Sequence, residues 1–404
     1  MRKKRILIIG AGREQVSAIV RAREMGFEVF ASDRNPAAPG FAFADHVFVV
    51  STTDVEGNLA VARQHAIDGV MTLISETAVP VVAEVARALG LPSLSADTVR
   101  WATDKVAMRR RFRDSGVSQP LFAVIEDAAD AAAKADHIGY PLVVKPSINS
   151  GQRGITLVRQ PSQLQQAVAE AALYAPDGIL LCEQYKEGRE INVTAVVIGG
   201  VVHILSLSDR KIYPWPVFGV AYAHHFPAQL SREEEEWVVR CTNEAVAALD
   251  MKNGIAYPQI IVNSEGAFLV EIAARIPGGY MREVALYASG VDLVDVALLQ
   301  SVGALGALAE LQRYPQSPAL CVRFLTTNDA NIPVGEVKAV SGVDEAGKVD
   351  GVVRAECFLR PGDMVESVKH STHRYVVVIA RGKDLPGAVR QAEKAVKFIR
   401  IAVR

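Results

Sequence analysis

A lysine followed at once by a glycine-containing loop is the first feature of this 404-residue sequence that suggests chemistry. Lys145 ends the apolar run 141–145, and the loop 147–154 that follows holds Gly151, Gly154 and small polar residues. An ammonium group at the end of a buried strand needs an anionic partner, because leaving it unpaired there is costly. Glycines let backbone N–H groups approach phosphate oxygens, and the GxxxxGKS/T pattern of P-loop enzymes is missing. The segment predicts a phosphate loop of another kind; taken alone, an exposed hairpin with a surface lysine is an equal alternative.

Two glutamates seven residues apart, Glu183 and Glu190, flank a chain reversal between two expected strands. Backbone groups at such a crossover can hydrogen-bond the edge of an adenine, and a carboxylate accepts bonds from ribose hydroxyls. We therefore expect Glu183 at the adenine and Glu190 at the ribose of a bound nucleotide. Considered separately, either residue could lie on the solvent face of its strand.

Residues 257–262 and 267–275 flank an Asn-Ser-Glu-Gly turn and predict a β-hairpin. Gln259 and Glu271 then fall nearly opposite each other, and Arg275 shares the face of Glu271 because strand side chains alternate. Amide and carboxylate oxygens suit Mg²⁺, which takes few protein carboxylates and leaves positions for phosphates and water. The guanidinium of Arg275 is suited to clamp a transferred phosphoryl group. An isolated Glu and Arg would more simply form a surface ion pair, but the three elements together favour a nucleotide site.

Four further positions are candidates for substrate contact. Glu76 follows the fourth expected strand, at the edge where ligands bind in open α/β sheets, although it could simply belong to the start of the next helix. Gly278 and Gly279 follow Arg275 in a turn that can bring backbone donors close to a carboxylate. His225 lies between the nucleotide-binding segments and could bind a carboxylate or act as a base; a structural role is the commoner explanation for such a histidine.

Short β-branched runs alternate with helical patterns over the first hundred residues, which predicts a parallel sheet covered by helices. The expected strands are residues 5–9, 29–31, 47–50 and 70–74. Gly10 and Gly12 close the first strand, but Gln15 occupies the third glycine position of a dinucleotide-binding fingerprint. A strand-to-helix turn that needs small residues is the favoured explanation.

The remaining pattern predicts a multidomain α/β and α+β chain. A basic helix that extends to Arg113 should face solvent, as charge runs on helices usually do. Strands and helices then alternate up to Glu183, antiparallel strands follow, and a Pro-rich break near residues 314–318 precedes a β-rich tail. We divide the chain into residues 1–100, 101–188, 189–316 and 317–404.

Composition argues against several classes of function. Lys and Arg total 44 against 45 Asp and Glu, a formal charge of -1, and there is no basic stripe with interleaved aromatic residues, so no nucleic-acid partner is expected. The four cysteines lie far apart, without a CxxC pair for zinc or redox chemistry. No apolar stretch approaches the roughly 20 residues that span a bilayer. We expect a cytoplasmic protein without a membrane partner.

The three nucleotide-site elements, in this order and spacing, resemble the ATP-grasp superfamily, which includes biotin carboxylase, carbamoyl-phosphate synthetase and D-alanine ligase. The resemblance covers nearly the whole chain and implies a parallel α/β pre-ATP-grasp domain, a two-lobed ATP-grasp fold and a C-terminal β-rich extension. It also implies the ATP contacts, which are Lys105, Lys145, the loop residues Ser147, Ser150, Gly151 and Gly154, the adenine-binding Glu183, Gln184 and Tyr185, and the ribose-binding Glu190.

Finer features of the sequence resemble different members of the superfamily. Ala273 stands where the Glu-Ile-Asn-x-Arg form of the metal motif has an asparagine ligand, which leaves Gln259 and Glu271 as the expected metal ligands. Gln259 is similar to the carbamoyl-phosphate synthetase pattern. The segment from Glu271 to Arg275 with its following glycines, and the tail around residues 359–363, look like L-amino-acid ligases of the bacilysin type.

The resemblance implies an ADP-forming carboxylate–amine ligase that uses ATP and Mg²⁺ or Mn²⁺, proceeds through an acyl phosphate and acts on an amino acid or small peptide. Arg275 and Lys145 would be its catalytic residues. Its partners would be small-molecule carboxylates and amines, and a homodimer would match the habit of the family. A purine-pathway carboxylase or formyltransferase and a non-catalytic nucleotide-binding protein remain alternatives. A biotin-dependent carboxylase is disfavoured because the chain has no biotinyl-lysine segment.

Overall fold

Four sheets, each with helices against it or beside it, make up the computed structural model. It describes residues 2–148, 151–214, 217–304, 306 and 317–404. Short 3-10 helices connect several elements: η1 (Arg13–Gln15), η2 (Pro39–Phe43), η3 (Glu76–Ala78), η4 (Ala128–Asp130), η5 (Pro161–Gln163) and η6 (Ser371–His373).

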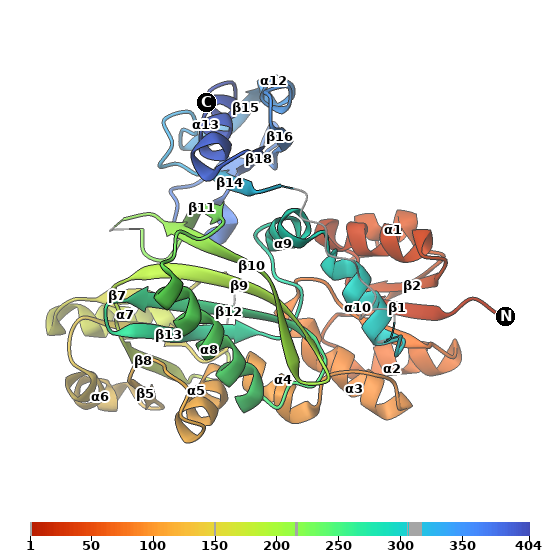
Figure 1. Ribbon diagram of the computed structural model, residues 1–404, viewed down its shortest axis with the longest axis horizontal. Helices are drawn as coiled ribbons and strands as arrows, with labels where there is room; N and C mark the ends of the chain where they lie inside the picture. The colour runs from red at the N-terminus through yellow and green to blue at the C-terminus, as the bar shows by residue number, and fades with distance from the viewer. Residues whose placement is uncertain (1, 149–150, 215–216, 305, 307–316) are drawn as a thin grey trace.

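The N-terminal domain has the predicted parallel sheet, with strand order β3-β2-β1-β4. Its strands are β1 (Arg5–Ile9), β2 (Glu28–Asp33), β3 (His46–Val49) and β4 (Gly69–Met71). Its helices are α1 (Val16–Glu24), α2 (Val55–Gln64) and α3 (Val79–Leu89). Figure 1 shows α1 on one side of these strands and α2 and α3 on the other, as right-handed crossovers between parallel strands require.

The glycine turn after β1 serves the strand-to-helix connection that we favoured. Gly10 has φ +101°, a conformation that L side chains rarely adopt. The Asp33 carboxylate accepts a hydrogen bond from the Ala11 N–H at 2.9 Å, and the Gln15 amide donates to the Leu73 carbonyl at 2.7 Å. Asp33 and Gln15 therefore hold the turn in place.

The small lobe is an antiparallel sheet of order β5-β8-β6-β7, reached through two linker helices. The linker helices are α4 (Ala96–Thr103) and α5 (Lys105–Asp114). The lobe contains β5 (Phe122–Ile125), α6 (Ala131–Ile138), β6 (Leu142–Pro146), β7 (Thr156–Val158), α7 (Leu164–Ala172) and β8 (Leu180–Gln184). Lys145 thus lies near the end of a buried strand, as the sequence indicates.

The largest sheet has eight strands in the order β13-β12-β9-β10-β11-β14-β18-β16. Its first strands along the chain are β9 (Arg189–Ile198), β10 (Val201–Ile212), β11 (Ala221–Phe226), β12 (Gly254–Asn263) and β13 (Gly266–Ala273). Helix α8 (Arg232–Ala248) begins with a complete capping box between Ser231 and Glu234 and packs on β12 and β13. The predicted hairpin is confirmed, because Gln259 pairs with Glu271 across β12 and β13.

The C-terminal unit contains the predicted β-rich extension, and its first strand continues this sheet. Its elements are β14 (Ala319–Leu325), β15 (Gly335–Ser341), α12 (Val343–Gly347), β16 (Val352–Cys357), β17 (Met364–Val365), β18 (Val376–Gly382), α13 (Leu385–Val396) and β19 (Arg400–Val403). Strand β14 pairs with β11, so the large sheet runs across the expected boundary between residues 316 and 317. Strands β17, β15 and β19 form the fourth, smaller sheet.

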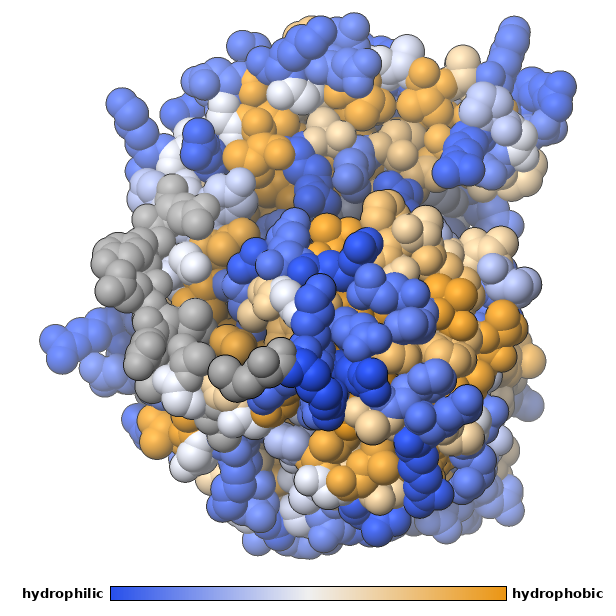
Figure 2. All heavy atoms as spheres, turned by 90° about the vertical axis from the view of Figure 1, so that its right-hand side faces the viewer, coloured by the Kyte–Doolittle hydropathy of each residue, from blue (hydrophilic) through white to orange (hydrophobic). Residues whose placement is uncertain are grey.

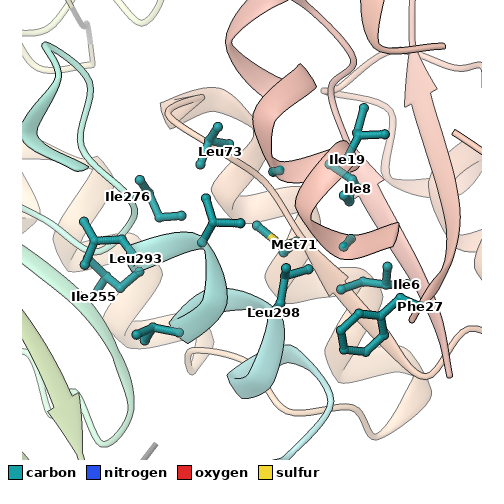
Figure 3. Packing of buried hydrophobic residues seen from close by; sticks show 14 of the residues in the cluster. Ile6, Ile8, Ile19, Phe27, Met71, Leu73, Ile255, Ile276, Leu293 and Leu298 are labelled. Carbon is teal, nitrogen blue, oxygen red and sulfur yellow. The ribbon is translucent and has the colours of Figure 1, made fainter. Parts of the chain in front are cut away.

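Two helices that follow the hairpin join the N-terminal domain to the large lobe. They are α9 (Met281–Ser289) and α10 (Leu293–Ser301). In Figure 3, Leu293 and Leu298 of α10 lie between Ile255 of the large lobe and Met71 and Ile6 of the N-terminal sheet. The two domains therefore share one hydrophobic core.

The outer surface on the N-terminal side mixes hydrophilic and hydrophobic residues, as Figure 2 shows. None of the helices in the described ranges is by itself long and apolar enough to cross a membrane. Helices α9 and α10 pass that test only as a pair, and they meet at a bend of 98°.

The substitution Leu298→Ala should lower the free energy of unfolding by about 2 to 5 kcal/mol, because Leu298 is fully buried and its truncation leaves a cavity in the shared core. Chemical denaturation followed by circular dichroism gives the shift in midpoint. Leu173, which is 81% exposed, supplies the control Leu173→Ala, for which little change is expected. Equal shifts for the two variants would contradict a core that α10 completes.

Candidate active site

A cavity of about 870 Å³ lies where the N-terminal domain, both lobes and the C-terminal unit meet. Its lining includes Glu76, Lys105, Lys145, Glu271, Arg275 and Arg374. Every part of the chain thus contributes charged groups to one cavity, and apolar cavities with a few convergent polar groups are the usual form of ligand sites.

Lys145 forms a buried ion pair at one wall of this cavity. Its Nζ lies 2.7 Å from Oε2 of Glu183, whose Oε1 lies 2.6 Å from Nε of Arg109. These three side chains, which we call the buried triad, are at most 6% exposed. The Glu183 carboxylate, which we expected to serve adenine, is bound to these two cations.

Arg109 extends the buried triad to the large lobe. Its guanidinium donates to the carbonyls of Leu269 at 2.9 Å and Val270 at 2.6 Å, the two residues that precede Glu271 on β13. The expectation that the basic helix faces solvent throughout is therefore wrong at Arg109, although Arg110 beside it is half exposed. The cause is tertiary: carbonyls and a carboxylate from both lobes satisfy the arginine.

Burial and charge act in opposite directions on the pKa values of the buried triad. Burial lowers the pKa of Lys145 to about 8, although the Glu183 carboxylate raises it. Burial would raise the pKa of Glu183, but Arg109 and Lys145 together lower it to about 2. The triad therefore holds one carboxylate ionised and leaves the lysine close to its titration range at neutral pH.

Gln259 and Glu271 form the candidate metal pair on the neighbouring strands β12 and β13. The lysine Nζ of Lys105 lies 3.8 Å from Oε2 of Glu271, too long for a direct hydrogen bond. Burial would raise the pKa of Glu271, but Lys105, Lys145 and Arg275 lower it, so the carboxylate stays ionised. An ionised carboxylate and an amide oxygen on one cavity wall fit Mg²⁺, whose other ligands would be water and phosphate.

The methyl side chain of Ala273 has no atom that could bind a metal. It is 3% exposed and packs in a hydrophobic cluster with Leu320 and Val377. The described residues also contain no group of three or more His, Cys, Asp and Glu side chains arranged to hold a metal ion. A metal at this wall would therefore have few protein ligands.

Arg275 and Glu76 meet in the cavity as an ion pair. Nε of Arg275 lies 2.5 Å from Oε2 of Glu76, which comes from the turn after β4 in the N-terminal domain. Gly278 and Gly279 line the cavity next to this pair. The structure therefore brings together the predicted phosphoryl clamp and three of the four predicted substrate residues.

The end of β8 and the residues that follow it line the cavity with Gln184, Tyr185 and Lys186. The Tyr185 ring approaches Phe218 with a centroid distance of 5.9 Å. Glu190, also in the lining, pairs with Arg210 on β10.

In the loop after β6, two of the predicted phosphate contacts, Ser147 and Gly154, do not line the cavity. Ser147 faces away from the cavity, where its hydroxyl donates to Asp177 at 2.5 Å. Gly154 packs against Tyr174, whose ring would lie 2.8 Å from an added Cβ, so this glycine serves packing inside the lobe. Ser150 lies outside the described residues, and Gly151 does line the cavity.

His224, not His225, faces the cavity. The two residues are neighbours on β11, so their side chains point to opposite sides of the sheet. Burial lowers the pKa of His224 well below its ordinary value, with Arg374 and Arg210 acting in the same direction. Its Nδ1 accepts a hydrogen bond from the Asn192 amide at 3.1 Å, which leaves the proton of the neutral ring on Nε2.

Three family models match successive parts of the chain. Residues 6–89 match the PylC-like N-terminal domain, residues 112–295 match the D-Ala-D-Ala ligase C-terminus, and residues 331–404 match the L-amino acid ligase C-terminal domain 2. The second match contains Lys145, Glu183 and Glu271, and the third contains Arg374.

Curated relatives are distant but extend over much of the chain. An uncharacterized protein y4rH of Sinorhizobium fredii is 25% identical over 97% of this chain and 81% of its own length. The carbamoyl phosphate synthase large chain of Thermomicrobium roseum is 26% identical over 89% of this chain, which spans 35% of that protein. The D-alanine–D-alanine ligase of Paracidovorax citrulli is 29% identical over 50% of this chain and 63% of its own length.

Solved structures share the whole fold. The L-amino acid ligase from Bacillus licheniformis superposes with a TM-score of 0.85 at 23% identity and full coverage of both chains. By these matches the chain is similar to ATP-grasp carboxylate–amine ligases over most of its length. Phosphoribosylglycinamide synthetase from Anaerococcus prevotii has a TM-score of 0.79 at 18% identity, again with full coverage of both chains. The biotin carboxylase domain of Hydrogenobacter thermophilus 2-oxoglutarate carboxylase, solved with MgADP, ADP and bicarbonate, has a TM-score of 0.75 at 19% identity, with 100% of this chain and 91% of that chain covered.

Several cavity residues escaped sequence reasoning. Arg109 lies in a run of basic residues, which does not distinguish it from its neighbours. Arg374 lies in the tail, outside any motif that the sequence analysis used. His224 differs from His225 only in strand phase, which the register of β11 decides. The available signal was the alternation of side chains along β11, which is fixed only once one residue of the strand is known to face the core.

The ratio kcat/KM for ATP should fall as the pH rises through about 8, because Lys145 loses its proton there and with it the attraction for phosphate. The carboxylate of Glu183 raises the pKa of Lys145, so Glu183→Gln should move this fall to lower pH. The test is the pH profile of kcat/KM for ATP, with Glu187→Gln as a control because Glu187 is exposed. A shift to higher pH, or none in a variant that circular dichroism shows to be folded, would refute this account of the triad.

Proposed function

We propose that this ATP-grasp chain joins the carboxylate of an amino acid or small peptide to an amine, with ADP and phosphate as products. One arrangement carries the proposal: the cations Lys105, Lys145 and Arg275 and the oxygen ligands Gln259 and Glu271 line the same cavity. Three positive side chains, together with an amide and a carboxylate oxygen that can bind Mg²⁺, suit the polyphosphate of a nucleotide and the phosphoryl group that it transfers.

The nucleotide would lie between the two lobes. Lys105 and Lys145 would pair with its phosphates, and Gln184 and Tyr185 would lie along its adenine. Glu190 would accept from the ribose, held in position by Arg210. Glu183 would act through Lys145, because its carboxylate oxygens are already bound within the buried triad.

A magnesium ion fits the oxygens of Gln259 and Glu271, and it would supply charge neutralisation at the phosphates. Arg275 lies beside this pair on the substrate side and would stabilise the three equatorial oxygens of the transferred group. Its partner Glu76 fixes the guanidinium from the N-terminal domain. Positioning and electrostatics therefore account for most of the catalysis that these residues can offer.

The first step transfers a phosphoryl group to the substrate carboxylate. A carboxylate oxygen attacks the γ-phosphorus, the bond to the β,γ-bridging oxygen breaks, and ADP leaves with the electron pair. The product is an acyl phosphate. The amine nitrogen then attacks the acyl carbon, inorganic phosphate leaves, and the amide nitrogen gives up a proton.

The cavity must exclude water during these steps, because water would hydrolyse the acyl phosphate. The backbone around Gly151 and Gln152 lies over the cavity and is held from two sides. The Ser371 hydroxyl donates to the Gly151 carbonyl at 2.9 Å, and the Gln152 amide donates to the Gly219 carbonyl. This contact would keep the phosphate loop closed over the reacting groups.

ADP release should depend on two substrates at once. Purified protein with ATP and Mg²⁺ is offered amino acids and dipeptides singly and in pairs, and mass spectrometry identifies the product. We expect ADP formation in step with a peptide or amide. Dependence on bicarbonate or formate with an amino ribonucleotide would favour the purine-pathway alternative, which the fold likeness to phosphoribosylglycinamide synthetase also permits. Nucleotide binding without turnover would favour the non-catalytic alternative.

The substitution Arg275→Ala should lower kcat about 10²- to 10³-fold, the usual loss for one stabiliser of transition-state charge. The KM for ATP should change less, because the two lysines remain. Steady-state ADP release gives both constants, and Arg360→Ala, in an exposed turn of the C-terminal unit, is the control. Turnover close to wild type in Arg275→Ala would contradict its role at the phosphoryl group.

A further inference from the structure

Two histidine rings lie in contact beside the segment that holds the loop after β6. The ring centroids of His370 and His373 are 3.9 Å apart, and the ring planes meet at 33°. Ser371 lies between them in the chain, at the start of η6. It contacts the Gly151 carbonyl twice, through its hydroxyl at 2.9 Å and its backbone N–H at 3.3 Å. The two histidines therefore flank the contact between the C-terminal unit and this loop.

His373 is buried, and its hydrogen bonds require a neutral ring. Its Nδ1 accepts from the Lys369 N–H at 3.1 Å, so Nδ1 carries no proton. The proton of the neutral ring is then on Nε2, which lies 3.4 Å from Oε2 of the exposed Glu366. A second proton would go to Nδ1 and break the bond from Lys369, although the carboxylate of Glu366 favours the charged ring.

His370 is subject to several positive charges. Burial lowers its pKa, and His373, Arg153 and Lys369 act in the same direction, whereas Glu366 raises it. Arg153 belongs to the loop after β6. A charged His370 would therefore repel this loop as well as a charged His373.

Two further groups next to the pair, Arg374 and Tyr375, follow η6. The Tyr375 ring stacks on His373 at a centroid distance of 6.1 Å, and burial raises the pKa of its phenol, which stays neutral. Arg374 donates from Nε to the Ser371 carbonyl at 2.9 Å. It remains a cation at neutral and acidic pH, because burial lowers its pKa only to about 10. Among the groups named around the histidines, positive charges thus outnumber negative ones.

We propose that His370 and His373 form a pH-sensitive latch, which keeps Ser371 on the Gly151 carbonyl while both rings are neutral and releases it when they gain protons. The latch itself follows from these contacts, and its consequence for turnover rests on the proposed function. An acyl phosphate reacts with water unless the cavity is covered. Release of Gly151 would therefore uncouple ATP consumption from amide formation.

Acid should open the latch. Because the pKa of His370 is lowered in the latched state, that state binds fewer protons than the released state. The latch is therefore complete above the ordinary histidine pKa of 6.5 and weakens as the pH falls below it.

The test measures ADP released per amide formed between about pH 8 and pH 5.5, the range in which histidines titrate. In wild-type protein this ratio should stay near one at the upper end. It should rise about fivefold at the lower end, the factor expected for two like charges about 4 Å apart in a water-like medium. The double variant His370→Phe/His373→Asn should keep a low ratio throughout, because neither residue can gain a proton while Asn retains an acceptor for the Lys369 N–H.

Two single variants complete the comparison. His137→Asn, on the exposed face of α6, should behave like the wild type. Ser371→Ala should raise the ratio at every pH and flatten its pH dependence, because the hydroxyl contact with Gly151 is gone at every pH. A ratio that rises with acid equally in the wild type and the double variant would overturn the latch.

Nitrogen-15 NMR of histidine-labelled protein tests the latch without any turnover. An unprotonated Nδ1 of His373 at neutral pH and a titration of His370 below its ordinary range support the proposal. A charged His373 at neutral pH would contradict it, whatever the fold of the variants. Should no amine support ADP release, the proposed function would fail, whereas the NMR titration would still decide on the latch.

Discussion

The buried triad of Arg109, Glu183 and Lys145 is the interaction on which the rest of the site depends. An arginine that is 1% exposed is stable only when its five N–H groups find acceptors. Here the acceptors come from three places: the Glu183 carboxylate in the small lobe, the Gln119 amide oxygen in the linker, and two carbonyls of β13 in the large lobe. Removing any one of them would leave a buried charge short of partners.

The triad also fixes distances that catalysis would need. Lys145 is tied to Glu183 in the small lobe, and the β13 carbonyls that Arg109 holds directly precede Glu271. Lys145 and Glu271 are thereby placed by contacts of the same guanidinium, although they belong to different lobes. A second ion pair, between Arg275 and Glu76, ties the large lobe to the N-terminal domain on the other side of the metal pair. Each domain boundary that meets the cavity is therefore held by a charged contact as well as by packing.

The sequence predicts local features well and the partners of charged groups poorly. The parallel sheet, the metal hairpin with Gln259 opposite Glu271, and the position of Lys145 in its strand follow from periodicity and turn residues, which are local. The burial of Arg109 could not be predicted, because its acceptors lie about 75 to 160 residues away in the sequence. The choice between His224 and His225 required the strand phase.

The large sheet runs across the expected boundary before residue 317, which the sequence could not reveal for a related reason. A Pro-rich break in the sequence indicates that a helix ends, but it does not reveal whether the next strand starts a new sheet or joins an existing one. Strand β14 joins β11, and this pairing brings Phe324 next to His224, where their rings meet at 5.5 Å.

The ring of Phe324 lies under the guanidinium of Arg374. Ser371, three residues before Arg374, donates a hydrogen bond from its hydroxyl to the Gly151 carbonyl in the loop after β6. One short stretch of the C-terminal unit thus contacts both the loop over the phosphates and the space beside Gly279. Phe324 lies on β14 and Arg374 lies two residues before β18, so this stretch adjoins the large sheet that also carries Gln259 and Glu271. The side chain that holds the Gly151 carbonyl is therefore anchored beside the sheet that carries Gln259 and Glu271, so the loop and these two residues are positioned by one framework.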